Sequence, residues 1–238
     1  MSEFDTQRDM LILVAQALGL ELRQQVTFVG GCTTGLLLTD AFIREQVRST
    51  DDVDLIVSVI GYPAFARLQQ QLSERGFRLS TQTEDSDDDF PICAMTLGQL
   101  RVDFIPDDEE VLGFSNRWYR EAVASSTPFE LKPDLIINLV NPVYFIATKL
   151  EAYRGRGRGD ALASRDIEDI LNLVDGRPEV LAEVDEAPAP VRQYIAEQLG
   201  ALLQDANFEY AINSHAAGSQ DRENLMFERL ETLAGERP

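Results

Sequence analysis

The strongest constraint on the fold is a short run of β-forming residues that carries acids at alternate positions. Residues 53–57, Val-Asp-Leu-Ile-Val, predict a β-strand. Side chains two residues apart on a strand point to the same face, so Asp52 and Asp54 project together. Two carboxylates at this spacing repel each other, and both stay ionised at neutral pH only if a cation lies between them. The pattern therefore predicts a strand with a cation-binding face.

A third acid lies in the next strongly apolar strand. Residues 100–105, Leu-Arg-Val-Asp-Phe-Ile, place Asp103 between β-forming side chains. If the two strands are neighbours, Asp52, Asp54 and Asp103 converge on one oxygen-rich spot, which suits one or two Mg²⁺ ions. Asp-rich segments also mark solvated loops, but Asp is depleted from strands, and this depletion favours the metal site.

Composition limits the class of protein. A chain of 238 residues with 44% hydrophobic residues can form one large domain or two small ones. No apolar run approaches the length of a membrane span, and the acidic N-terminus lacks the pattern of a signal peptide. Cys32 and Cys93 offer no disulfide framework, and His215 is the single histidine, expected at the surface. We expect a soluble, cytoplasmic protein without a membrane partner.

The net charge of −20 argues against broad, non-specific binding to nucleic acid, which requires an extended basic surface. Much of the acidity lies in two runs, 84–89 and 107–110, which are expected to be solvated loops or hairpin segments. Positive charge is concentrated at Arg154, Arg156 and Arg158. An RNA partner would have to be engaged at that local patch, although the segment could equally be a glycine-rich loop without a ligand.

The order of elements predicts an α/β fold. Gly30 and Gly31 form a turn between a strand over 26–29 and a helix that continues to about residue 46, with Leu36, Leu37, Phe42 and Ile43 on its buried face. We expect a mixed sheet with helices packed against it. The other expected elements are helices over 5–20 (stopping at Gly19) and about 64–76, and strands over 53–57, 77–81, 91–97 and 100–105, the last two joined by a turn at Gly98-Gln99.

The pattern changes to helices after Asn141, which is a good N-cap before Pro142. We therefore expect an α/β domain over 1–139 and a helical bundle domain over 140–238. The expected helices cover about 142–154, 164–175, 178–186, 191–213 and 220–234, with residues 187–190, Ala-Pro-Ala-Pro, as a rigid spacer.

Three motifs together resemble a known superfamily. Residues 30–34 (Gly-Gly-Cys-Thr-Thr), 48–54 (Arg-x-Thr-x-Asp-x-Asp) and 102–104 (Val-Asp-Phe) are similar to the DNA polymerase beta-like nucleotidyltransferases. Residues 145–154 around Lys149, with 165–169 (Arg-Asp-Ile-Glu-Asp), resemble the AbiEii/AbiGii-type toxin nucleotidyltransferases, which include the MenT toxins. The resemblance covers roughly residues 26–175.

The resemblance implies that residues 1–139 form a catalytic domain and that the active site lies in the cleft between the two domains. It also implies a role for each candidate residue. Asp52, Asp54 and Asp103 would hold Mg²⁺ or Mn²⁺, and Asp103 would act on the acceptor hydroxyl. The remaining implied roles concern the triphosphate of an NTP: Gly30, Gly31, Thr33 or Thr34 would contact it, Lys149 and Arg48 would neutralise it, and Asp166 or Asp169 would position Lys149. Taken singly, the glycines could be an ordinary turn, and Lys149, Asp166 and Asp169 could be surface residues.

The expected reaction transfers NMP from an NTP to an acceptor hydroxyl and releases pyrophosphate. The resemblance implies an RNA acceptor such as a tRNA 3′ end, and a toxin that is silenced by an antitoxin protein. Two alternatives stay open: a transferase that modifies a small molecule or a protein side chain, and a catalytically silent module that binds NTP.

Overall fold

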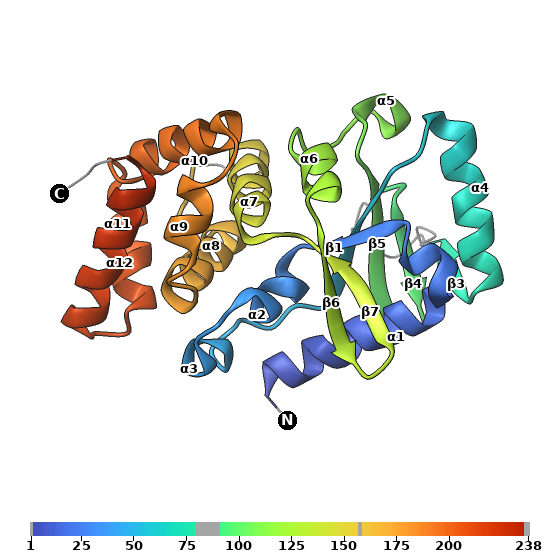
Figure 1. Ribbon diagram of the computed structural model, residues 1–238, viewed down its shortest axis with the longest axis horizontal. Helices are drawn as coiled ribbons and strands as arrows, with labels where there is room; N and C mark the ends of the chain where they lie inside the picture. The colour runs from blue at the N-terminus through green and yellow to red at the C-terminus, as the bar shows by residue number, and fades with distance from the viewer. Residues whose placement is uncertain (1, 80–90, 157–158, 236–238) are drawn as a thin grey trace, which may run out of the picture. The chain divides into compact units, whose positions relative to one another are not determined.

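The computed structural model describes residues 2–79, 91–156 and 159–235, which form two compact units (Figure 1). The first unit comprises residues 1–33 and 48–140, and the second comprises residues 34–47 and 141–238. The chain therefore leaves the first unit at residue 34, returns at 48 and leaves it finally after 140. The sequence analysis drew a single boundary, after residue 139, and kept residues 34–47 with the sheet.

The first unit is built on a mixed β-sheet, so the α/β class expected from the sequence is confirmed at this level (Figure 1). Its strands among the described residues follow the order β3-β4-β5-β2-β1-β7-β6. The pairs β2–β5 and β1–β7 are parallel, and the other neighbours are antiparallel. The strands are β1 (Val26–Val29), β2 (Asp52–Val57), β3 (Phe77–Leu79), β4 (Ala94–Leu97), β5 (Leu100–Pro106), β6 (Thr127–Lys132) and β7 (Leu135–Leu139).

The hairpin of β6 and β7 is absent from the sequence-based prediction. β7 pairs with β1 in parallel, with Thr27 opposite Asn138, and it alternates buried and more exposed side chains along its length. Asp134 makes the tight turn between the two strands, with φ of 65°. The short β6, which has mostly exposed or half-buried side chains, forms the edge of the sheet.

Helix α1 (Glu3–Arg23) packs along β7, β6 and β1 with one apolar face. Ser2 caps its start together with Asp5, because each accepts a hydrogen bond from the other's backbone N–H. Gly19 was expected to end this helix, and the helical backbone is interrupted there. Gly19 has φ of 68° and produces a kink, after which the helix continues for another turn.

The segment after Gly31 was predicted as one helix to about residue 46, and this prediction is wrong. The chain forms a 3₁₀ turn, η1 (Gly31–Thr33), followed by α2 (Thr34–Leu37) and α3 (Ala41–Arg44). Asp40 starts α3 as a new helix, because its carboxylate accepts from the N–H groups of Phe42 and Ile43. Phe42 is 70% exposed rather than buried. Leu37 and Ile43 are buried as expected.

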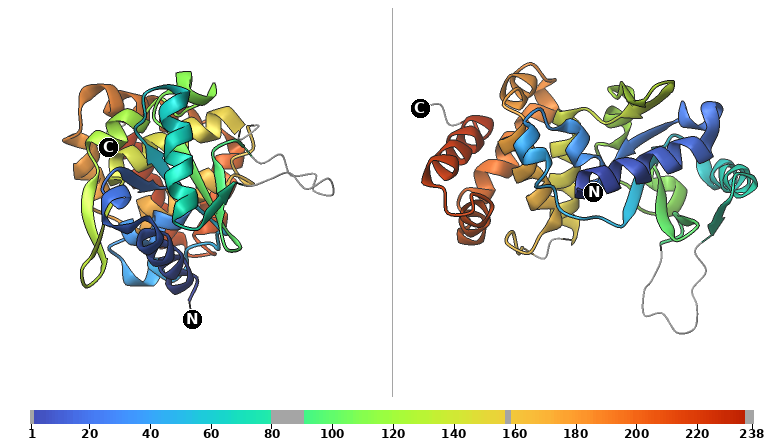
Figure 2. Two further views of the ribbon diagram at one scale, coloured as in Figure 1. Left: turned by 90° about the vertical axis from the view of Figure 1, so that its right-hand side faces the viewer. Right: turned by 90° about the horizontal axis from the view of Figure 1, so that it is seen from below.

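The remaining elements of the first unit differ from the predictions mainly at their boundaries. Helix α4 (Gly61–Glu74) lies alongside β3 (Figure 2), and the strand expected over 91–97 begins at Ala94. The run 107–110 was expected to be a loop or hairpin segment: Asp107 and Asp108 precede α5 (Glu109–Leu112), which Asp108 caps, whereas Glu109 and Glu110 lie in that helix. Helix α6 (Tyr119–Ala124) follows. The acidic run 84–89 and residues 80–81 lie outside the described residues.

The second unit is helical, as expected for the C-terminal region. Asn141 caps α7 by accepting from the N–H of Tyr144 at 3.0 Å, which confirms the predicted N-cap. The helix predicted over 191–213 is wrong, because Asp205 starts a separate helix. The proposed spacer is also wrong after Pro188, where α10 begins. The helices are α7 (Pro142–Arg156), α8 (Arg165–Gly176), α9 (Val180–Asp185), α10 (Ala189–Leu202), α11 (Ala206–His215) and α12 (Gln220–Leu233).

Residues 34–47 join this unit through α8. The N–H groups of Thr39 and Asp40 both donate to the carbonyl of Gly176 at 2.9 Å. Gly176 leaves little room for a side chain, since a Cβ built on it would lie 3.0 Å from Ile43 and 3.1 Å from Leu38. The two chain segments therefore pack closely. Within the described residues, no helix has the length and apolar character needed to cross a membrane.

Candidate functional site

The acids of the two predicted strands lie on adjacent strands of the sheet. β2 and β5 pair in parallel, with Asp54 opposite Asp103 and Asp52 opposite Arg101. Val53 and Leu55, which alternate with the acids, are fully buried in the core. Opposite residues on paired strands share a face, so the three carboxylates and Arg101 lie on the other side of the sheet. We call this set, Asp52, Asp54, Asp103 and Arg101, the acidic face.

Gly30 makes room for the carboxylate of Asp54. It follows β1, whose last residue, Val29, is opposite Asp54. Gly30 has φ of +80°, and a Cβ added to it would lie 1.9 Å from Asp54 Oδ2, far inside any real contact distance. The glycine is thus required by the acid beside it, whereas the resemblance implies that it lets the backbone approach a triphosphate.

Asp52 and Asp103 have different partners. Thr50 donates its hydroxyl to Asp52 Oδ1 at 2.6 Å. Arg101 binds Asp103 with two hydrogen bonds, from Nε to Oδ1 at 2.9 Å and from Nη2 to Oδ2 at 2.6 Å. The hydrogen bond to Asp103 raises the pKa of Arg101 above its ordinary value and outweighs the opposing effect of burial, with the charges of Asp52 and Asp54 adding to the shift. All three carboxylates therefore act on one guanidinium.

Two buried thiols adjoin these charges. Burial raises the pKa of Cys93 to about 12, and the charge of Asp103 adds to the shift. Burial likewise raises the pKa of Cys32 well above its usual range, with further contributions from Asp54 and Asp52 and a smaller opposing one from Arg48. Burial thus disfavours the thiolate form of both cysteines, which is the form that acts as a nucleophile.

The hydroxyls of Thr33 and Thr34 are both engaged within the chain. Thr33 donates to the carbonyl of Gly30 at 2.8 Å and closes the turn that includes Gly31. Thr34 donates to Asp169 Oδ1 at 3.3 Å. Both side chains are buried. Arg48 is half-buried, and its backbone carbonyl accepts from Gln7 Nε2 at 2.5 Å.

Lys149 on α7 and the two acids on α8 form a closed cluster in the second unit. Its Nζ lies 2.6 Å from Asp169 Oδ2 and 3.1 Å from Asp166 Oδ1. Lys149 is 7% exposed, Asp166 4% and Asp169 1%. The three residues were expected at the surface if they had no function, and burial contradicts that alternative. The resemblance implies that Asp166 or Asp169 positions Lys149, and both carboxylates contact its ammonium.

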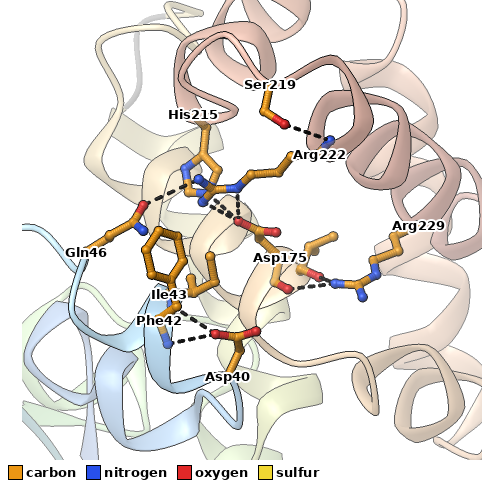
Figure 3. Close-up of polar contacts among 10 residues, drawn as sticks. Asp40, Phe42, Ile43, Gln46, Asp175, His215, Ser219, Arg222 and Arg229 are labelled. Carbon is orange, nitrogen blue, oxygen red and sulfur yellow. Dashed lines mark hydrogen bonds and ion pairs between the residues drawn. The ribbon is translucent and has the colours of Figure 1, made fainter.

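A second charged cluster in the same unit lies outside the predicted residues (Figure 3). Arg222 Nε donates to Asp175 Oδ2 at 2.6 Å, and His215 Nε2 lies 3.2 Å from the same oxygen. Arg222 also donates to Gln46 at 3.3 Å, which attaches the segment 34–47 to α12. His215 was expected at the surface, but its side chain is only 11% exposed.

The basic patch is described only in part. Arg154 is exposed on α7 and lies 3.5 Å from Glu151 on the same helix. Arg156 ends α7, and its side chain lies outside the described part of the chain, as does Arg158. The one described guanidinium of this patch is therefore shared with a neighbouring carboxylate.

The acidic face fits a divalent cation by its donor chemistry. Three carboxylates share one side of two adjacent strands, and the guanidinium of Arg101 stands in as the cation at Asp103. Within residues 2–79, 91–156 and 159–235, no three His, Cys, Asp or Glu side chains are already gathered as a ligand set. Asp103 would have to exchange Arg101 for the metal ion.

Comparison with protein families and with curated proteins finds no match to this sequence.

Sequence reasoning missed Arg101 and Thr50 as members of the site. Both positions carried a usable signal. Arg101 is two residues before Asp103 on a strand, and Thr50 is two residues before Asp52 in an extended segment, so each pair points to one side.

Proposed function

We propose that the chain is a metal-dependent nucleotidyltransferase that transfers NMP from an NTP to an acceptor hydroxyl. The observation that supports this most is the register of β2 and β5, which puts Asp54 opposite Asp103 with Asp52 on the same face. The close contact of Gly30 with Asp54 adds a glycine turn at the same place. This combination corresponds to the motifs on which the resemblance rests.

In this proposal Asp52, Asp54 and Asp103 hold Mg²⁺ or Mn²⁺. A divalent ion at this position supplies positive charge for the phosphates of the NTP and for the departing pyrophosphate. The acceptor oxygen forms a bond to the α-phosphorus, and the bond from that phosphorus to the bridging oxygen of pyrophosphate breaks. The acceptor proton passes to Asp103, which is the buried carboxylate of the three.

The proposed acceptor is RNA, such as a tRNA 3′ end, and the proposed biological role is a toxin with an antitoxin partner. Both follow from the resemblance. With a net charge of −20, the chain would hold RNA through few phosphate contacts, which makes binding short-ranged and local. A transferase that acts on a small hydroxylated molecule or on a protein side chain is the second candidate, favoured by the same acidity.

The test is incubation with each α-³²P-labelled NTP, Mg²⁺ and total cellular RNA. Wild type should label RNA, Asp54→Asn should not, and Asp51→Asn should behave as wild type. Asp51 is a matched control because it is exposed and precedes β2 immediately. Label in protein or small molecules would favour the second candidate. NTP binding without any transfer would contradict the enzyme and leave a silent NTP-binding module.

A further inference from the structure

Arg101 lies between two environments, a buried acid and solvent. Its side chain is 35% exposed, whereas the side chain of its partner Asp103 is 9% exposed. The two hydrogen bonds of 2.9 and 2.6 Å engage both oxygens of Asp103. Loss of this contact would leave the backbone pairing of β5 intact, because that pairing involves neither side chain.

An arginine in this position compensates for missing positive charge. Arg101 is in register with Asp52, and the neighbouring pair in the same two strands is Asp54 and Asp103. A buried carboxylate such as Asp103 is costly without a counter-charge, and the carboxylates of Asp52 and Asp54 on the same face repel it. The guanidinium thus neutralises this face when no metal ion is bound.

We propose that Arg101 is an exchangeable counter-cation, which holds Asp103 in the metal-free protein and is displaced from it when a divalent ion binds. This inference rests on the cation site of the proposed function. It assigns Arg101 as a positioning residue that keeps Asp103 ordered and competes with the metal for its two oxygens. Removing Arg101 should therefore strengthen metal binding and weaken the metal-free fold.

The test measures Mn²⁺ affinity of the full chain by isothermal titration calorimetry after removal of metal with EDTA. Arg101→Gln should bind Mn²⁺ about tenfold more tightly than wild type, because the ion no longer displaces a bidentate partner. Its Tm in EDTA should fall, and saturating Mn²⁺ should raise its Tm by more than it raises that of wild type.

Arg78→Gln is the matched control. Arg78 is opposite Thr96, which is opposite Arg101, so the two arginines lie in the same row of the sheet and on the same face, two strands apart. Arg78 is exposed. Its replacement removes the same charge and should leave Mn²⁺ affinity close to that of wild type. A tightening by Arg78→Gln equal to that by Arg101→Gln would overturn the proposal, since a distant charge would then suffice.

A double-mutant cycle with Asp103→Asn isolates the contact. In the Asp103→Asn background, Arg101→Gln should no longer tighten Mn²⁺ binding. An undiminished tightening in that background, or an equal or weaker affinity of Arg101→Gln alone, would overturn the proposal. If Arg101→Gln does not fold, Arg101→Lys replaces it: the ammonium keeps the charge but loses the bidentate geometry, so Mn²⁺ should still bind more tightly than in wild type.

These measurements are independent of nucleotidyl transfer. Tighter Mn²⁺ binding by Arg101→Gln in a chain that transfers no nucleotide would support the exchange and contradict the proposed function. Transfer by wild type, with Mn²⁺ affinity unchanged by Arg101→Gln, would support the function and overturn the exchange.

Discussion

The acidic face of the sheet and the Lys149 cluster of the helical unit use the same chemistry in opposite ways. Each pairs carboxylates with one basic side chain on regular secondary structure. The side chain of Arg101 is 35% exposed, whereas that of Lys149 is 8% exposed. An ion pair whose cation reaches solvent can exchange that cation for another. A pair enclosed by protein exchanges its cation less readily, so removal of that cation should have a large effect on stability.

The comparison teaches that the types of charge in an ion-pair cluster do not determine whether solvent reaches its cation. Asp166 and Asp169 are the same residue type as Asp54 and Asp103, but both contact one lysine from a neighbouring helix, which closes the set. The acidic face instead has its cation on its own strand, two residues from the acid that it binds. Accessibility of the cation is the property that separates the two.

The largest expected effect concerns the closed cluster. Lys149→Met should lower the free energy of unfolding by about 3–5 kcal/mol, because two buried carboxylates lose their only common cation in the described structure. Urea denaturation followed by circular dichroism measures the change. Lys132→Met in β6 is the matched control, since Lys132 is half-buried, and it should cost less than about 1 kcal/mol. Equal costs for the two variants would show that the Lys149 cluster is not closed.

A somewhat smaller effect is expected at Gly30, which lies against Asp54 of the acidic face. Gly30→Ala should destabilise the fold by about 2–4 kcal/mol, because it adds both an unfavourable positive φ and a collision with Asp54. Gly113→Ala isolates the first contribution, since Gly113 has φ of +81° and no atom within 4 Å of an added Cβ. That control should cost about 1–2 kcal/mol. If the two variants cost the same, Asp54 does not depend on the glycine for its position.

The smallest effect is expected at Asp175, a carboxylate of the helical unit that is paired with His215 and Arg222. Burial raises its pKa, but the hydrogen bonds and charges of His215 and Arg222 outweigh burial and leave the pKa below its ordinary value of 3.8. A lowered folded-state pKa contributes stability that is present above about pH 4 and is lost as the pH falls through the folded-state pKa.

Asp175→Asn should therefore cost about 1–3 kcal/mol at neutral pH and flatten the loss of stability below about pH 4. Thermal unfolding from pH 2 to pH 7 provides the measurement. Asp185→Asn, which changes an exposed acid of the same unit, should retain the wild-type pH profile. If the stability of Asp175→Asn fell as steeply below about pH 4 as that of wild type, Asp175 would not be the carboxylate responsible for the loss.

The sequence was most informative where periodicity and chemistry coincided. The strand with Asp52 and Asp54, the strand with Asp103 and the N-cap at Asn141 follow from local patterns that tertiary structure did not override. The region 31–46 was misassigned because its apolar residues fit a helical period, while Asp40 offers a cap that starts a new helix. The pairing of β7 with β1 is a long-range choice that no local pattern encodes.

The site was predictable as a set of residue types and less so as a set of contacts. Alternation along a strand was enough to place the acids on one face. Burial was harder to infer: Lys149, Asp166 and Asp169 have the spacing of surface residues, and their enclosure depends on how α7 and α8 pack. Thr33 and Thr34 show the same limit. The hydroxyl of Thr33 donates to the nearby Gly30, whereas that of the adjacent Thr34 donates to Asp169, which is far away in the sequence.

The attachment of residues 34–47 to α8 has a consequence for how the chain folds. Thr39 and Gly176 are joined by a hydrogen bond across 137 positions, so this early segment lacks its partner on α8 until most of the chain has been synthesised. The side chains of Leu38 and Ile43, which pack against Gly176, lack that contact until then. A chain cut after residue 140 would retain this segment without α8 and would be more prone to aggregate through the apolar surface left uncovered.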